Sequence, residues 1–219
     1  MKTERQKVII SHLTPCNVFG DVGCDHGVMT EAVLSLNIAG RAVYSDVSPL
    51  CLKKAQTLLA PFKARATGVV ADGIVSAHAE CDQVLIAGMG GMEIIKILQT
   101  AYTLPLRLVL QPMKDEERVR RTLHALSYRI TTDTLFSAEG KYYYLITAEK
   151  GEESTPYGER EYRYGRDVLK EFSPVFTRIL TERKAVLESA LKGATEKEEL
   201  LLRLREIEEL MAYGNQKNR

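Results

Sequence analysis

Three aspartates lie at the ends of three short apolar segments and could together form a binding site. Asp21 lies in "NVFGDV", Asp46 lies in "RAVYSDV", and Asp72 ends "ATGVVAD". The carboxyl ends of parallel strands meet at one edge of a sheet, which would bring the three carboxylates together. One acid at a strand end is as often a helix cap or a loop residue, whereas three in succession favour a ligand site.

The turn "DVGCDHG", residues 21–27, has the composition of a nucleotide-binding loop with an acidic centre. Gly23 would let the backbone turn tightly, and a helix beginning near Gly27 would offer unpaired amides. Asp46 lies 46 − 27 = 19 residues beyond Gly27, where an acid can accept both hydroxyls of an adenosine ribose. Asp25 at the middle position makes the turn a poor seat for the pyrophosphate of a dinucleotide.

S-adenosylmethionine suits this turn better, because it carries a sulfonium and an ammonium group and no phosphate. Methyltransferases of this fold typically carry D/E-x-G-x-G-x-G, which the turn matches at Asp21, Gly23 and Gly27. "ADG" would place Asp72 near the adenine amino group, and "IAGMGG" would leave bare backbone beside the transferred methyl group. His26 could hydrogen-bond the cofactor or orient the target base, but hydrogen bonding to backbone groups within the turn explains this histidine at least as well. The predicted cofactor-binding residues are Asp21, Gly23, Cys24, Asp25, His26, Gly27, Asp46, Val47, Asp72, Gly73, Ala87 and Gly88.

Strand-length apolar segments alternate with helical patterns through the first part of the chain. The segments are rich in Val, Ile and Leu and cover 17–22, 41–47, 66–72, 83–89, 106–112 and 141–150. This alternation predicts an α/β fold with a mostly parallel, Rossmann-like sheet covered by helices on both faces. The "YYY" run at 142–144 is better explained as part of a strand than as a stacking platform for bases.

The last part of the chain has a different composition. Charged residues make up 27 of the 68 positions in 152–219 but only 32 of the 151 positions in 1–151. Ser173-Pro174 has the pattern of a helix start. Two apolar stripes predict helices that pair as an antiparallel coiled coil with a turn near 192–199; they are Phe176, Ile179, Val186 and Ala190, and then Leu200, Leu204, Ile207 and Met211. We therefore predict a cofactor-binding catalytic domain over 1–151 and a helical hairpin domain over 152–219.

The overall composition narrows the class of protein. The formal net charge is +1 and the pI is about 7.7, so nucleic acid would have to bind through a local patch. The four cysteines show no C-x-x-C spacing, which predicts reduced thiols and no metal site. No apolar stretch reaches the roughly 18 residues of a membrane span, and the charged N-terminus does not resemble a signal peptide. These features predict a cytoplasmic protein.

At "DVGCDHG", "ADG", "IAGMGG" and "LVLQP" the sequence resembles the bacterial tRNA (adenine(22)-N1)-methyltransferase family (TrmK-like). Its members carry D-I-G-S-D-H-A, G-D-G, I-A-G-M-G-G and L-I-L-Q-P-N, and the resemblance extends over essentially the whole chain. Cys24 stands where the family usually has Ser, Gly27 where it has Ala, and Met113 where it has Asn, while "YGR" at 164–166 replaces a usual G-P. The resemblance implies a tRNA methyltransferase dependent on S-adenosylmethionine, with a Rossmann-like domain and a C-terminal coiled coil.

The implied reaction is methylation of N1 of adenosine 22. Adenine N1 has its own lone pair, so the enzyme must mainly align the reacting atoms. N1 lies on the Watson–Crick edge, so the base must be unpaired or flipped out. Carbonyls or a carboxylate would stabilise the cationic product. The residues predicted to act in catalysis are Asp25, Gly88, Met89, Gly90, Gln111 and Pro112; Met113 lacks the amide with which an Asn could contact the target base.

Two groups of basic residues are predicted to bind tRNA. One follows "LQPM" and the other flanks the start of the C-terminal domain; the predicted contacts are Arg118, Arg121, Arg160, Arg163, Arg166 and Lys170. Arg120, Arg178, Arg183 and Lys184 lie in the same regions. An ordinary solvated surface is the competing interpretation, because Asp and Glu are interspersed. The alternative functions are a small-molecule or protein methyltransferase of the same fold, and a non-catalytic RNA-binding protein on that scaffold. We expect a monomer or a weak dimer.

Overall fold

The computed structural model describes residues 2–193 and 196–217. Its strands are β1 (Cys16–Val22), β2 (Ala39–Asp46), β3 (Ala66–Val70), β4 (Gln83–Met89), β5 (Arg107–Pro112), β6 (Tyr128–Ala138) and β7 (Lys141–Lys150). Its α-helices are α1 (Glu4–Ser11), α2 (Val28–Ser35), α3 (Pro49–Leu58), α4 (Gly91–Gln99), α5 (Glu116–Ala125), α6 (Glu159–Tyr164), α7 (Arg166–Glu171), α8 (Pro174–Gly193) and α9 (Glu198–Lys217). Two short 3-10 turns, η1 (Ala60–Phe62) and η2 (Ser76–His78), follow α3 and β3.

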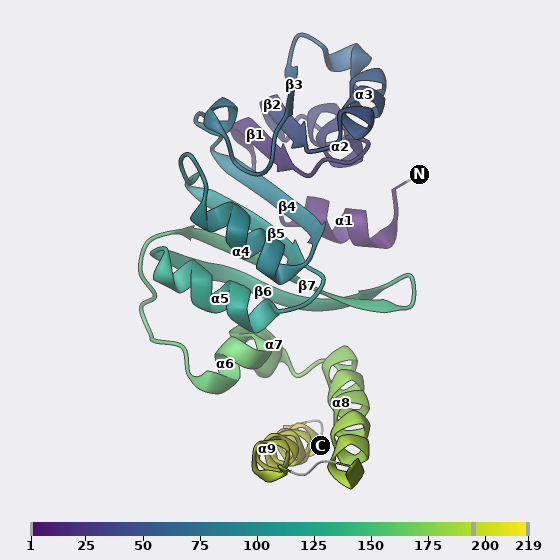
Figure 1. The fold of residues 1–219 in the computed structure, drawn as a ribbon, viewed down its shortest axis with the longest axis vertical. Coiled ribbons are helices and arrows are strands. Elements are labelled where there is room, and N and C mark those ends of the chain that lie inside the picture. The colour runs from purple at the N-terminus through teal and green to yellow at the C-terminus, as the bar shows by residue number, and fades with distance from the viewer. Residues whose placement is uncertain (1, 194–195, 218–219) are drawn as a thin grey trace. The chain divides into compact units, whose positions relative to one another are not determined.

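The strands form one seven-stranded sheet in the order β3-β2-β1-β4-β5-β7-β6 (Figure 1). Strands β1 to β5 pair in parallel, and β7 runs antiparallel to both β5 and β6. The predicted α/β, Rossmann-like and mostly parallel sheet is therefore confirmed. The chain moves outward from β1 in one direction and, from β4, in the other. Ligands bind at such a switch point, beside the carboxyl ends of the strands.

The strand β6 was missed by the sequence analysis. Its sequence, "YRITTDTLFSA", has few consecutive apolar residues and holds an aspartate at its centre. It is nevertheless paired with β7 from Tyr128 opposite Lys150 to Ala138 opposite Lys141. An edge strand buries alternate residues, so its pattern is weaker than that of the continuous apolar runs in the central strands.

Helices cover both faces of the sheet (Figure 1). On one face, Ile9 of α1, Val33 of α2 and Ala55 of α3 are fully or almost fully buried in a core with β1 and β2. On the other, Ile94 of α4 and Val119 of α5 are buried against β4 and β5. These two cores fix the strand ends, and so the loops that leave them.

The two helices predicted for the end of the chain are present as α8 and α9, and they pack against each other. The hydroxyl of Ser173 accepts a hydrogen bond from the amide of Phe176, which confirms the predicted helix start. Lys184 of α8 forms an ion pair of 2.9 Å with Glu208 of α9. The turn predicted over 192–199 overlaps both helices, because α8 extends to Gly193 and α9 begins at Glu198; residues 194–195 lie outside the described residues.

The predicted stripe on α8 is wrong in its second half. Phe176 and Ile179 are buried, but Val186 is 67% exposed and Ala190 is also exposed. The half-buried residues are Leu187 and Leu191 instead. They continue from Leu180 at intervals of seven and four residues, which is the repeat of a coiled-coil seam. On α9 the predicted stripe is confirmed, since Leu200, Leu204, Ile207 and Met211 are all half-buried or buried.

Internal contacts divide the chain into two compact units, Met1–Asp167 and Val168–Arg219. The division expected from the composition, after Gly151, falls earlier than the boundary between these units. Residues after Gly151 remain tied to the first unit: the carboxylate of Glu153 accepts a hydrogen bond from the amide of Ile130, and Arg120 donates to the carbonyl of Tyr162. Among the described helices, none combines the length and apolar composition that crossing a membrane requires.

Candidate functional site

The turn after β1 is shaped by two glycines with positive φ. Gly23 has a φ of 72°, and a Cβ there would lie 1.9 Å from the Cε atom of Met89. Gly27 has a φ of 76°, and its Cβ would lie 2.9 Å from the Cβ of Ala55 in α3. Both positions therefore favour glycine on backbone conformation, and Gly27 also on space, because Ala55 cannot move aside as the flexible end of Met89 can. The amides of Gly23 and Cys24 bind the carbonyl of Ser45 at the end of β2, which joins the two loops.

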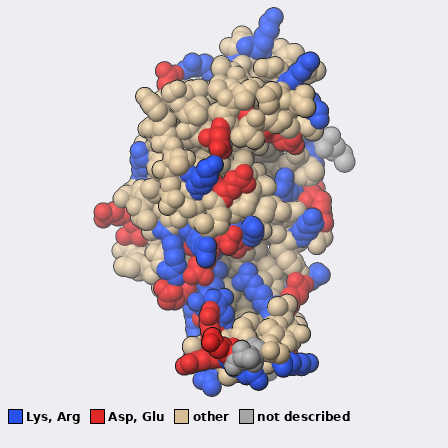
Figure 2. All heavy atoms as spheres, viewed as in Figure 1, with Lys and Arg blue, Asp and Glu red and all other residues tan. Residues whose placement is uncertain are grey.

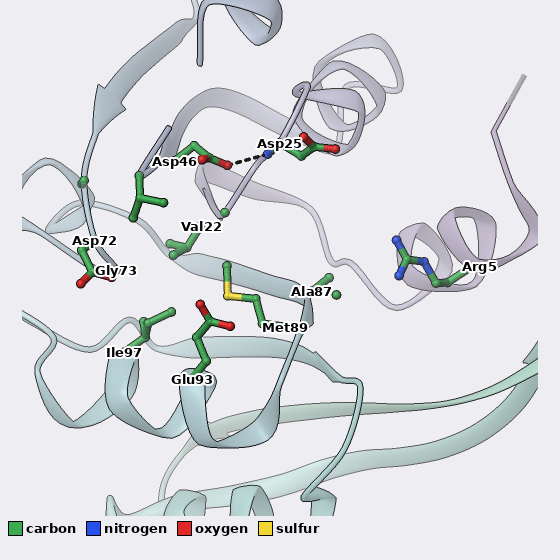
Figure 3. A pocket seen from close by; sticks show the side chains of 14 residues that line it. Arg5, Val22, Asp25, Asp46, Asp72, Gly73, Ala87, Met89, Glu93 and Ile97 are labelled. Carbon is green, nitrogen blue, oxygen red and sulfur yellow. Dashed lines mark hydrogen bonds between the residues drawn. The ribbon is translucent and has the colours of Figure 1, made fainter. Parts of the chain in front are cut away.

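Asp46 is held in a fixed orientation at the end of β2. One carboxylate oxygen accepts a hydrogen bond from the amide of Asp25 at 3.0 Å (Figure 3). The other accepts one from the amide of Ser48 at 2.8 Å. Asp25 itself has a φ of 49°, a conformation uncommon for a residue with a side chain. Asp46 therefore both faces the cavity and stabilises the turn that carries Asp25. Each oxygen keeps a second lone pair for a ligand hydroxyl.

Asp21 lies below the turn and is almost completely buried. The hydroxyl of Thr30 in α2 donates a hydrogen bond of 2.6 Å to its carboxylate. Burial raises the pKa of Asp21 from its ordinary value of 3.8 to about 6, despite the Thr30 hydrogen bonds that act in the opposite direction. A carboxylate kept in this environment is suited to a positively charged ligand group, which would compensate its charge.

Burial of Asp21 predicts a stability that depends on pH. Above pH 6 the folded protein must hold a buried carboxylate that the unfolded chain keeps in water, so its charge destabilises the fold. This cost is absent below pH 3.8 and fully present above pH 6, where the shift corresponds to at most about 3 kcal/mol. We expect Asp21→Asn to raise the melting temperature of the free protein at pH 7.5 and to leave it nearly unchanged at pH 3.5. Thermal unfolding at both pH values, with the exposed Asp72→Asn as the matched control, measures this; a lower melting temperature at pH 7.5 would contradict it.

A cavity of about 340 Å³ opens at the carboxyl ends of β1, β2 and β4, above the start of α4. Figure 3 shows its lining, in which Asp46 comes from the end of β2, Asp72 from the loop after β3 and Glu93 from α4. A smaller cavity of about 110 Å³ lies beside it and shares four lining residues with it: Arg5, Gly23, Asp25 and Ala87. Together they form one acid-lined site at the switch point of the sheet.

The structure brings most of the predicted cofactor residues to this site. The larger cavity is lined by Gly23, Asp25, Asp46, Val47, Asp72, Gly73, Ala87 and Gly88, and the smaller one also by Asp21, Cys24 and His26. Gly27 lines neither and acts through the turn and its contact with α3. Asp72 is exposed and forms an ion pair of 3.0 Å with Lys96.

The residues predicted for catalysis are less uniformly placed. Met89 lines the larger cavity with Gly88 and Asp25, whereas Gly90, Gln111 and Pro112 line neither cavity. The side chain of Gln111 is fully buried; its amide nitrogen donates to the carbonyl of Pro112. Its amide oxygen accepts a hydrogen bond of 3.2 Å from Arg5. Gln111 therefore does not line the cavity, and it contacts the site only through its hydrogen bond with Arg5.

Five residues that line the larger cavity were missed by the sequence analysis: Arg5, Val22, Ala71, Glu93 and Ile97. Glu93 and Ile97 lie in α4, and Arg5 lies in α1. For Arg5 the sequence offered no signal of a site, because the residue precedes all the motifs; its neighbours Thr3 and Gln6 indicate only a helix cap. Glu93 could have been found from its position two residues after "GMGG", in the first turn of the helix that this loop begins.

The predicted tRNA-binding arginines have diverse surroundings. Arg118 contacts the sulfur of Met92 at 3.4 Å. Arg121 pairs with Glu117 and Glu159 and lies over the ring of Tyr162. The side chain of Arg166 is 17% exposed, pairs with Glu161 and Glu153, and lies over Tyr157; Arg163 approaches Glu117, and Lys170 belongs to the second unit. On the face seen in Figure 2, basic and acidic side chains are interspersed.

Arg120 differs from its neighbours, and its grouping with the RNA-facing arginines was wrong. Its side chain is fully buried, with its Nε atom 2.6 Å from the carboxylate of Asp133 in β6. It cannot contact RNA, because no part of it reaches the surface. The pattern "RVRR" gave no indication of this, since every position in it could be exposed on a helix.

One group of side chains could bind a metal ion. Donor atoms of Asp25, His26 and Cys51 lie within 4.8 Å of one another at the rim of the site. The ammonium of Lys54 lies 3.2 Å from the His26 ring nitrogen, which places a positive charge where the metal would bind. We therefore assign no metal to this group.

The fold and the acid-lined site define a Rossmann-like methyltransferase. The family model of the tRNA (adenine(22)-N(1))-methyltransferases, TrmK, matches residues 19–216. The chain belongs to this family.

Individual relatives agree with this membership. A Mycoplasma pneumoniae protein described provisionally as a tRNA methyltransferase is 31% identical over 142 residues, which is 64% of this chain and 66% of that protein. The tRNA (adenine(22)-N(1))-methyltransferase of Bacillus subtilis is 27% identical over 162 residues, 71% of this chain and 68% of that protein. These alignments thus span about two thirds of each relative. Sp1610 of Streptococcus pneumoniae, solved in complex with S-adenosyl-L-methionine, has the same fold, with a TM-score of 0.86, 24% identity and coverage of 96% of this chain and 100% of that one.

Proposed function

We propose that this protein transfers a methyl group from S-adenosylmethionine to N1 of adenosine 22 in tRNA. The observation that supports this best is the acid-lined cavity at the switch point of a chain that belongs to the TrmK family. The lining suits the cofactor: glycines at 23 and 88 leave room against the backbone, and the carboxylates complement a sulfonium and an ammonium group.

Each part of the cavity has a role in holding the cofactor. Asp46 accepts the ribose hydroxyls, because its carboxylate is already oriented by the amides of Asp25 and Ser48. Asp72, at the far side of the cavity, accepts from the adenine amino group, and Val47 and Ile97 contact the ring. When bound, the cofactor supplies an electrophilic methyl group next to a positive sulfur.

The protein contributes alignment and charge to the transfer. The loop formed by Gly88, Met89 and Gly90 offers a surface with little steric hindrance, on which an unpaired adenine can direct N1 at the methyl group. N1 needs no base, since it attacks with its own lone pair. Asp25 is 73% exposed in its side chain and Glu93 faces the same cavity, so both carboxylates can stabilise the positive charge that develops on the adenine.

The tRNA itself is far larger than the cavity and must be held mainly through its phosphates. Arg118 follows the catalytic loops and has no carboxylate partner among its contacts in the described structure, so its charge is available to RNA. The charged helical pair α8 and α9 offers further Lys and Arg side chains to a long substrate. Arg121, Arg160, Arg163, Arg166 and Lys170 complete the proposed contacts. The cytoplasmic location and the monomeric or weakly dimeric state belong to the same proposal.

Methylation of defined tRNAs by the full-length protein tests the function. One tRNA carries adenosine at position 22, and a matched transcript carries guanosine there; both are incubated with labelled S-adenosylmethionine and digested to nucleosides. We expect 1-methyladenosine from the first transcript only. Equal labelling of both would move the target to another position. Labelling of small metabolites or of protein, with neither tRNA labelled, would support the alternative methyltransferases, and binding of tRNA with no transfer to any substrate would support a scaffold protein.

A further inference from the structure

Arg5 lies at the edge of the cofactor site, where contacts with Gln111 and Tyr143 fix its position. Its guanidinium donates to the buried side-chain oxygen of Gln111 at 3.2 Å and lies over the ring of Tyr143, 5.6 Å from its centroid. A Cβ at Gly88 would lie 3.5 and 3.9 Å from its two terminal nitrogens. The half-buried side chain thus passes close to the bare backbone of the catalytic loop.

The helix that carries Arg5 is firmly attached to the first unit. Thr3 and Gln6 form a reciprocal capping box at its start, and Ile9 is buried in the core. The amide of Glu4 donates to the carboxylate of Glu139, at the turn between β6 and β7. Arg5 therefore reaches the site from a fixed position.

The charges around the site are strongly unequal. Five carboxylates line the two cavities: Asp21, Asp25, Asp46, Asp72 and Glu93. Among the described lining residues, Arg5 is the only Lys or Arg. A ligand that is only cationic would gain nothing from it, whereas a ligand with one anionic group would be oriented by it.

Arg5 also lies at a particular end of the site. In Figure 3, it is on the side opposite Asp72, Gly73 and Ile97, with Ala87 between them. It shares the smaller cavity with Asp21, the buried carboxylate. One end of the site thus carries the carboxylate of Asp21 and the guanidinium cation of Arg5 in one cavity. A negative and a positive group together complement the ammonium and carboxylate of an amino acid zwitterion.

We infer that Arg5 binds the carboxylate of the methionyl group of S-adenosylmethionine, while the ammonium group is directed to Asp21. The inference rests on the proposed cofactor. It makes α1, which lies outside the glycine-rich motifs, part of the binding site. It also explains why the Gln111 oxygen is buried against Arg5: the amide orients the guanidinium that the ligand uses.

Two ligands that differ only in the carboxylate provide the test. S-adenosylmethionine and its decarboxylated form are titrated by calorimetry into the wild type, Arg5→Gln and Arg5→Lys, all full length. We expect Arg5→Gln to weaken S-adenosylmethionine binding by about 10- to 100-fold, the effect of losing a charge-assisted hydrogen bond, and to leave binding of the decarboxylated form unchanged. Arg5→Lys, which keeps the positive charge, should lose less affinity for S-adenosylmethionine than Arg5→Gln. Asp46→Ala is the matched control at the ribose and should weaken both ligands alike.

The outcomes are distinct. Equal losses for both ligands in Arg5→Gln would mean that Arg5 only supports the cavity through Gln111, and would overturn the inference, as would no loss at all. Unchanged affinity for the decarboxylated ligand also shows that the variant is folded. Failure of the wild type to bind S-adenosylmethionine would instead refute the proposed cofactor, and with it this role of Arg5.

Discussion

A chain that ends after Asp167 should bind S-adenosylmethionine with near wild-type affinity and lose tRNA methylation. The first unit, residues 1–167, contains both cavities and both faces of the sheet with their cores. The second unit carries seven Lys and Arg side chains on α8 and α9, interspersed with seven Glu side chains, and we expect the basic ones to contact tRNA phosphates. Calorimetry with the cofactor and a transfer assay with tRNA measure the two properties separately.

The position of the cut decides whether this experiment is interpretable. A cut after Gly151 would remove the Tyr162 carbonyl that Arg120 binds and the Asp167 carboxylate that accepts from the amide of Asp133, and would destabilise the remaining domain. A cut after Asp167 keeps both. The salt dependence of tRNA binding should fall with the truncation, because fewer counterions are released. Methylation at near wild-type efficiency by the shortened chain would show that the helical pair is not a substrate-binding surface.

Breaking the Arg120–Asp133 pair should destabilise the protein by about 3–5 kcal/mol, because one buried charge is left without its partner. Both side chains are fully buried, with two hydrogen bonds of 2.6 and 2.9 Å between them. Arg120 also lies over the ring of Tyr144, 4.9 Å from its centroid, and donates to the carbonyl of Tyr162. Urea unfolding of Arg120→Met and of Asp133→Leu measures the loss.

The double variant, Arg120→Met with Asp133→Leu, is the matched control. It removes both charges and fills a similar volume with apolar atoms, so it should recover much of the stability lost by either single change. A partly exposed pair on the same helix, Arg121 with Glu117, provides the comparison; Glu117→Gln leaves Arg121 its second partner, Glu159, and should cost less than about 1 kcal/mol. A loss of under 1 kcal/mol in both single variants would mean that water reaches the buried pair.

The sequence predicted those residues of the cavity lining that lie close to their own strand ends. Asp46 and Asp72 follow apolar strands, and Gly23 and Gly27 occupy turns that their spacing already indicates, so local pattern and parallel topology together placed them. Arg5 could not be found in this way, because it reaches the cavity only through the packing of a helix from outside the motifs.

The other differences have the same origin in long-range contacts. Arg120 stands among exposed arginines and is buried only because β6 provides Asp133, and β6 itself was missed because its alternating pattern is weak. On α8, both Val186 and Leu187 fit an apolar stripe in isolation. The leucine lies in the seam because the partner helix, and not the sequence of α8 alone, sets which side is covered.

The contact between Gly165 and Asp133 limits how this sequence can evolve. Gly165 has a φ of 93°, and a Cβ there would lie 2.8 to 2.9 Å from all three atoms of the Asp133 carboxyl group. Any other residue at 165 would displace the carboxylate from Arg120. Positions 120, 133 and 165 are therefore expected to covary, so that lineages which replace the glycine also exchange the ion pair for apolar residues.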